Sequence, residues 1–168
     1  MVEGSLLALY RFKKYVTKQG DNGDIAALTL TETDSSKLPA LEAGARRGVI
    51  YAESTNMARD LINEPGNVAT PSYLADHAQA MARELGLEVS ILDREHMEHL
   101  GMGSILAVAQ GSAQRPKLIV LRYWGAGKSD TRPPLALVGK AVTFDSGGIS
   151  IKPSDGMGGM KGDMSGGA

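Results

Sequence analysis

The sequence predicts an α/β protein in which helices flank a mixed sheet, and three features lead to this fold class. After residue 66, helical and strand patterns alternate along the chain, which is typical of helices packed against a sheet. Residues 38–66 have helical spacing of apolar side chains and predict a long connecting helix. A glycine-rich segment with lysines and carboxylates follows an apolar run near the end of the chain, as expected where a sheet edge opens onto a polar site.

The first 37 residues are expected to be the C-terminal tail of an N-terminal α/β domain. Residues 2–16 are rich in apolar side chains, and the Gly-Asp-Asn-Gly sequence at residues 20–23 indicates a turn. Residues 25–30 then predict a short strand. The segment therefore looks like the tail of a preceding domain.

The connecting helix is predicted from the regular placement of its apolar residues. Leu41, Ala45, Val49 and Ala52 lie near one face, and Pro65 with Gly66 ends the helical pattern. An alternative is an ordinary amphipathic core helix, because the same spacing suits both. The sequence pattern alone leaves both interpretations open.

The remaining residues, 67–168, predict the N-terminal part of an α/β domain. Thr70 is a candidate N-cap for a helix with Pro71 in its first turn, and Gly86 is expected to end that helix. Residues 87–92 predict a strand, and Asp93 is expected to cap a short helix that reaches residue 100. Two further strands are predicted at residues 118–124 and 135–138.

Composition excludes several classes of function. The 168 residues contain 18 Lys and Arg against 19 Asp and Glu, so the net charge of −1 provides no field that would attract nucleic acid or an anionic membrane. The chain has no cysteine, which excludes disulfides and thiolate metal ligands and fits a reducing compartment. Because no run of 18 apolar residues occurs, we expect a cytoplasmic protein with no membrane partner.

Charged residues in the glycine-rich segment are the candidates for chemistry. Lys140 and Asp145 follow the predicted strand at residues 135–138, and Lys152 and Asp163 lie farther along. Ligands in open α/β sheets bind beyond the carboxyl ends of strands, so Asp145 is expected to reach back toward Lys140. Carboxylates bind divalent metals, and nearby metal ions lower the pKa of a lysine. A neutral amine can then ligate metal, while a protonated one can stabilise developing negative charge.

Each candidate also has an ordinary structural interpretation. Lys140 and Asp145 suit a surface ion pair that flanks a tight turn. Lys152 suits a solvated lysine at a strand end, and Asp163 suits a helix N-cap. Met160 belongs to a set of methionines at helical spacing, which is more often a sign of core packing than of a pocket.

Two motifs resemble the leucyl (cytosol) aminopeptidase family. Residues 138–152, VGKAVTFDSGGISIK, and the later Met160, Lys161 and Asp163 look like the family's metal-binding segment. Residues 56–67, NMARDLINEPGN, resemble its interdomain helix and the loop that enters its catalytic domain. The match is collinear over about the last two thirds of the chain.

The resemblance implies a role for each candidate residue. Lys140 would ligate one metal, Asp145 would bridge two metals, and Asp163 would be a further ligand. Lys152 would polarise the scissile carbonyl or stabilise the tetrahedral intermediate. Met160 would line the pocket for the first side chain of the substrate, so that Lys152, Met160 and Asp145 would contact the substrate.

The implied activity is two-metal hydrolysis that releases N-terminal amino acids, leucine among them, from peptides with a free N-terminus. The implied cofactors are two divalent ions, zinc or manganese, with magnesium and cobalt as further candidates, and a bicarbonate in the full-length protein. The family also implies a cytoplasmic homo-oligomer, a hexamer. Its later Asn-Thr-Asp-Ala-Glu-Gly-Arg segment supplies two more carboxylates and an arginine, and this chain ends at Ala168 before any such segment.

The expectation is therefore a fragment, truncated at both ends, that is inactive by itself. One alternative is a non-catalytic fragment that binds metal or acts through a partner surface. Another is a nucleotide- or phosphate-binding module that uses the glycines at residues 147–148 and 166–167. This last alternative is disfavoured, because carboxylates rather than lysine–serine pairs dominate the neighbourhood.

Overall fold

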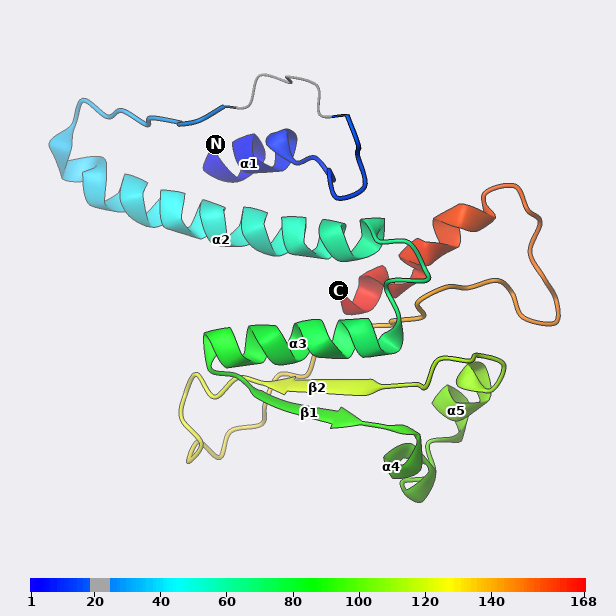
Figure 1. Ribbon diagram of the computed structural model, residues 1–168. Coiled ribbons are helices and arrows are strands. Elements are labelled where there is room, and N and C mark those ends of the chain that lie inside the picture. Colours follow the sequence, from blue (N-terminus) through cyan, green and yellow to red (C-terminus); the bar gives the residue numbers. More distant parts are fainter. Residues whose placement is uncertain (19–24) are drawn as a thin grey trace. The chain divides into compact units, whose positions relative to one another are not determined.

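The computed structural model describes residues 1–18 and 25–168, which form two compact units, Met1–Asn63 and Glu64–Ala168 (Figure 1). The turn expected at residues 20–23 lies outside the described residues. The α/β fold class is confirmed, because the second unit contains a sheet with flanking helices. No helix among the described residues has the length and apolar character needed to cross a membrane.

The first unit consists of two helices that pack together. Helix α1 (Val2–Leu9) lies along helix α2 (Leu38–Asn63), which follows a short 3₁₀ helix, η1 (Ser35–Lys37). The approach is close at Gly48, where a Cβ atom would lie 3.2 Å from the Glu3 backbone nitrogen. The helix predicted within residues 38–66 is confirmed as α2, but the strand predicted at residues 25–30 is wrong, because these residues have no regular secondary structure.

Polar residues at the end of α2 hold the segment that follows α1. The Tyr10 hydroxyl donates a hydrogen bond to Asp60 Oδ1 at 2.7 Å and accepts one from Asn63 Nδ2 at 3.1 Å. Arg59 donates to the Leu7 carbonyl at 3.1 Å and lies over the Tyr10 ring. Arg59, Asp60 and Asn63 of the 56–67 motif thus have a structural role within the first unit.

Helix α3 (Pro71–Leu85) begins the second unit and has both predicted ends. The Thr70 side chain accepts a hydrogen bond from the Tyr73 backbone nitrogen at 3.3 Å, with Pro71 at the first helical position. Gly86 ends the helix with φ of 68°, a left-handed conformation that favours glycine. The buried face consists of Leu74, Ala75, Ala78 and Ala82.

The sheet contains two antiparallel strands, β1 (Glu88–Leu92) and β2 (Leu118–Arg122), with Glu88 opposite Arg122 and Leu92 opposite Leu118. Helix α3 packs on both strands (Figure 1). Two short helices, α4 (Arg94–His99) and α5 (Gly103–Ala109), connect the strands. Both strands and the short helix capped by Asp93 are confirmed, whereas α5 is an addition to the predicted elements.

The strand predicted at residues 135–138 is wrong. The segment has no regular secondary structure, and Leu135, Leu137 and Val138 are 87%, 89% and 98% exposed. A strand requires a hydrogen-bonded neighbour as well as apolar residues of suitable type. Lys140 therefore follows an exposed segment without regular secondary structure.

A 3₁₀ helix, η2 (Met157–Gly167), occupies the end of the chain (Figure 1). Because a 3₁₀ helix has three residues per turn, Met157, Met160, Asp163 and Gly166 lie on one face. Met164 is fully buried on another face. The N-cap interpretation of Asp163 is wrong, since Asp163 lies inside η2 and Gly156 is at the N-cap position.

Candidate metal centre

Asp145 is held by backbone contacts from both sides of the candidate site. Its backbone nitrogen donates to the Met160 carbonyl in η2 at 3.4 Å, and its Oδ1 accepts a hydrogen bond from the Gly147 backbone nitrogen at 3.0 Å. The Lys152 backbone nitrogen donates to the Ser146 carbonyl at 2.9 Å and closes the loop between them. Gly147 has φ of 88°, and a Cβ atom there would overlap the Ser150 carbonyl, so this tight loop requires glycine.

The Lys152 side chain returns to Asp145 across this loop. Its Nζ lies 2.7 Å from Asp145 Oδ2 and 3.1 Å from Met160 Sδ. The Lys152 ammonium, followed by the Gly147 backbone N–H, holds the pKa of Asp145 below its usual value. Lys152 and Asp145 are 37% and 36% exposed, so solvent still reaches the pair.

Lys140 pairs with Asp163 of η2. Lys140 Nζ lies 2.8 Å from Asp163 Oδ2, and the side chains are 62% and 27% exposed. The carboxylate of Asp163, with a smaller effect from Asp145, raises the pKa of Lys140. Asp163 Oδ2 itself is buried, and no donor among the described residues, Lys140 included, meets it at hydrogen-bonding angles. The contact is thus an ion pair by distance, and one carboxylate oxygen lacks a hydrogen bond.

The structure brings together all five residues that the sequence singles out. Lys140 lies beside Asp163, and Lys152 lies beside Asp145 and Met160. The simple surface pair of Lys140 with Asp145 is not the direct contact, although the two charges influence each other's pKa. Lys140 instead pairs with the carboxylate that is farther away in the sequence, and Lys152 pairs with the nearer one, Asp145.

Two supporting contacts were not anticipated from the sequence. The Met160 carbonyl accepts from Asp145, a role that no side-chain pattern indicates. The Phe144 ring packs against Gly66, where a Cβ atom would lie 3.0 Å from Phe144 Cδ2, and this contact anchors the residue before Asp145. The only sequence signal for it is a glycine after Pro65 where the helical pattern ends.

The chemistry of the donors fits a divalent cation. Two carboxylates and one amine form an oxygen-rich donor set, which suits hard divalent ions and discriminates weakly among them. Buried charges in proteins are paired or coordinate metals, and Asp163 Oδ2 is buried against the Lys140 ammonium, so a divalent cation would be an alternative partner for this oxygen. Across residues 1–18 and 25–168, no three His, Cys, Asp or Glu side chains lie close enough together to hold a metal. These residues therefore provide part of a coordination shell.

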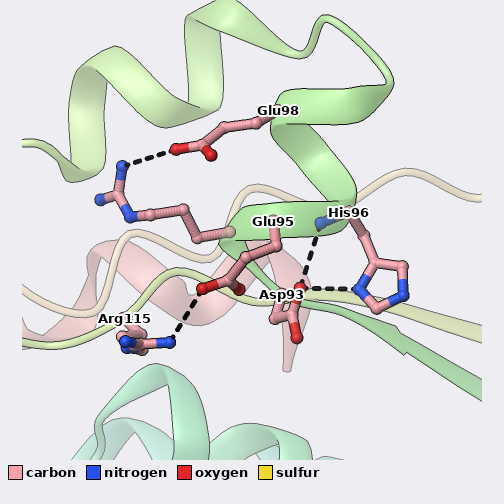
Figure 2. Close-up of polar contacts among 6 residues, drawn as sticks. Asp93, Glu95, His96, Glu98 and Arg115 are labelled. Carbon is pink, nitrogen blue, oxygen red and sulfur yellow. Dashed lines mark hydrogen bonds and ion pairs between the residues drawn. The ribbon is translucent and has the colours of Figure 1, made fainter.

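A second polar cluster surrounds the start of α4 (Figure 2). His96 Nδ1 lies 2.6 Å from Asp93 Oδ1, which also accepts from the His96 backbone nitrogen at 3.1 Å. These contacts, the backbone bond first, lower the pKa of Asp93 to about 2. Arg115 contacts Glu95 at 3.1 Å and ties the segment before β2 to α4. The cluster caps and fastens a helix, so it has a structural explanation.

Comparisons with known proteins agree with the motifs. Residues 56–168 match the family model described as the cytosol aminopeptidase family, catalytic domain. The probable cytosol aminopeptidase of Solibacter usitatus is 52% identical over 167 residues, which are 99% of this chain and 34% of that protein. The probable cytosol aminopeptidase of Alkaliphilus oremlandii is 47% identical over 169 residues, which are 100% of this chain and 34% of the relative.

Solved structures show the same likeness. The cytosol aminopeptidase from Coxiella burnetii superposes with a TM-score of 0.78 and 31% identity, over 98% of this chain and 32% of the other. The bottromycin maturation enzyme BotP, in a complex with Mn, gives a TM-score of 0.77 and 33% identity, over 99% and 32% of the two chains. The chain spans about a third of the length of these relatives. Since the family model matches well over half of its residues, the chain belongs to the cytosol aminopeptidase family.

Proposed function

We propose that this chain provides the first part of the active site of a metal-dependent aminopeptidase, which releases N-terminal amino acids, leucine among them, from peptides. The observation that carries the proposal is the convergence of the two lysine–carboxylate pairs, beside a buried Asp163 oxygen that lacks a hydrogen bond. Family membership supports the reaction class, and the Mn complex of BotP supports a divalent metal.

Each residue has a proposed part in the reaction. Lys140, Asp145 and Asp163 would hold two divalent ions, which would supply a Lewis acid and a water of lowered pKa when bound. Once Asp145 serves as a metal ligand, the Lys152 ammonium loses its carboxylate partner. It is then available to stabilise negative charge on the substrate carbonyl oxygen. Met160, whose sulfur already contacts Lys152 Nζ, lines the pocket for the first substrate side chain.

The finer parts of the proposal come from the family. The ions are zinc or manganese, with magnesium and cobalt as further candidates, and a bicarbonate acts as general base in the full-length protein. Two further carboxylates and an arginine complete the site from the part of the relatives that this chain does not span. The protein is proposed to be a cytoplasmic homo-oligomer, and the names of its relatives support the location.

We also propose the domain division expected from the sequence. Residues 1–37 form the tail of an N-terminal domain, and residues 67–168 form the first part of the catalytic domain. Residues 38–66 form the helix that connects these two regions. The boundary between the two compact units at Asn63 and Glu64 lies near the end of the proposed connector and supports this division.

The test compares the chain with a protein extended through the later family segment. Calorimetric titration with Mn²⁺ or Zn²⁺ measures metal affinity, and hydrolysis of a leucyl amide measures turnover. We expect turnover only from the extended protein, and its loss in an Asp145→Ala variant. Asp130→Ala is the matched control, because Asp130 is a carboxylate that pairs with Arg132 outside the site. Full activity of Asp145→Ala with unchanged metal content would refute the assignment.

The non-catalytic alternative has one observation in its favour, namely the incomplete set of carboxylates among the described residues. It predicts weak metal binding by the chain and no metal-dependent turnover from the extended protein. The same pair of assays therefore separates the two functions.

A further inference from the structure

Three glycines bring two backbone segments together beside the candidate metal centre. A Cβ atom at Gly139 would overlap the Gly166 carbonyl oxygen and would lie 2.7 Å from both Gly166 C and Gly167 Cα. A Cβ atom at Gly167 would lie 2.9 Å from Ala141 Cβ, and one at Gly166 would lie 3.2 Å from the Lys140 carbonyl oxygen. We call this the glycine contact, formed by Gly139, Gly166 and Gly167.

Space, rather than backbone conformation, is what requires glycine at these positions. None of the three has a positive φ, so each backbone would accept an L side chain in isolation. Gly158 and Gly159 of the same 3₁₀ helix differ, because a Cβ atom at either would meet nothing within 4 Å. The close approach is therefore local to the part of η2 that faces Lys140.

The glycine contact adjoins the pair of Lys140 and Asp163 along both backbone segments. Lys140 follows Gly139 in the chain, and Asp163 precedes Gly166 by one turn of a three-residue helix, on the same face. Any separation of the two backbones at Gly139 and Gly166 would therefore be transmitted to Lys140 Nζ and Asp163 Oδ2, which are 2.8 Å apart. The contact of Lys152 with Asp145 does not involve these glycines.

We propose that Gly139 and Gly167 are positioning residues, which bring the Lys140 amine and the Asp163 carboxylate close enough to ligate one divalent cation. The part of this inference that concerns metal rests on the proposed function. The part that concerns the placement of Lys140 against Asp163 is independent of it. Contacts that orient metal ligands typically change metal affinity by about 10–100-fold when they are lost, and we expect a loss in this range for Gly139→Ala.

The first experiment uses the chain without added metal. Ion-paired lysine ammonium groups are followed by ¹H–¹⁵N NMR at low temperature and one fixed pH, and Lys140→Arg identifies the Lys140 signal. Asp163→Asn and Gly139→Ala should both shift or remove the Lys140 signal. The chemical shift of the Lys152 signal should be unchanged in both variants. Gly158→Ala should change neither signal. A Lys140 signal that is unchanged in Gly139→Ala would overturn the inference.

A rescue experiment separates positioning from general loss of structure. Gly167→Ala introduces a methyl group against Ala141 Cβ, and the next two nearest atoms are at ordinary contact distances of 3.4 and 3.5 Å. Gly167→Ala should therefore disturb the Lys140 signal, and the added substitution Ala141→Gly should restore it. Failure of the double variant to restore the signal would contradict the steric explanation.

The metal experiment titrates Mn²⁺ into the same variants. Binding by Gly139→Ala that is about 10–100-fold weaker than by the unsubstituted chain and by Gly158→Ala supports the inference. Equal affinity for all three overturns it. If the unsubstituted chain binds no Mn²⁺, the same titrations are made in the protein extended through the later family segment. Absence of Mn²⁺ binding there, while Gly139→Ala still displaces the Lys140 signal, supports the placement of Lys140 and refutes the metal site.

Discussion

A substitution of Lys152 tests the proposal that Lys140 ligates metal while Lys152 stabilises negative charge on the substrate. The change is Lys152→Ala in the protein extended through the later family segment. The substitution removes an ammonium that lies 2.7 Å from Asp145 Oδ2 and 3.1 Å from Met160 Sδ. If that ammonium stabilises the charge that forms on the carbonyl oxygen, its loss should lower kcat by about 10²–10³-fold. At about 1.4 kcal/mol per tenfold, this is about 3–4 kcal/mol of transition-state stabilisation.

The structure separates this effect from loss of the fold. Lys152 and Asp145 are each more than a third exposed, and ion pairs of that kind contribute little to stability, so the thermal midpoint should barely move. Metal content should also stay unchanged, because Lys152 is not a proposed ligand.

Leucyl amide hydrolysis at saturating Mn²⁺, with metal content measured on the same samples, provides the assay. Lys128→Ala is the control, since that lysine is 75% exposed and pairs with Glu88 at 3.4 Å. A loss of turnover below tenfold, or a loss of metal that parallels the loss of activity, would refute the role given to Lys152.

Three further predictions concern the second unit. Lys140→Arg should lower metal content, because a guanidinium stays protonated and has no lone pair to donate; metal analysis that finds unchanged content would exclude Lys140 as a ligand. Met97→Ala should lower the free energy of unfolding by about 2–5 kcal/mol in urea denaturation, because Met97 is fully buried, whereas a change below 1 kcal/mol would show that the site collapses around the smaller side chain. Asp93 has its pKa lowered to about 2, so its contribution to stability is present above about pH 4 and is lost as the pH falls toward 2. Urea denaturation at pH 5 and at pH 2.5 measures how far the free energy of unfolding falls between the two pH values. This fall should be smaller for Asp93→Asn than for the unsubstituted chain, and an equal fall would contradict the linkage.

Local sequence determined the elements whose signals lie within a few neighbouring residues. Helix α3 illustrates this, since Thr70, Pro71 and Gly86 each act through hydrogen bonds or backbone angles inside one turn. The same is true of Asp93, which caps α4 through the His96 backbone nitrogen. The family motifs likewise identified Lys140, Asp145, Lys152, Met160 and Asp163 as one group, and the structure places them together.

Tertiary structure decided the features that depend on contacts between residues far apart in the sequence, namely strand pairing and the pairing of lysines with carboxylates. Residues 25–30 and 135–138 have strand-like composition, but a strand forms only where another strand accepts its hydrogen bonds, and composition does not specify that neighbour. The pairing of each lysine was also decided at this level. Residues 157–167 wind with three residues per turn, so that Met160 and Asp163 face the same segment. Gly139, Gly166 and Gly167 allow the two backbone segments to approach closely. Lys140 therefore pairs with Asp163, and Asp145 pairs with Lys152.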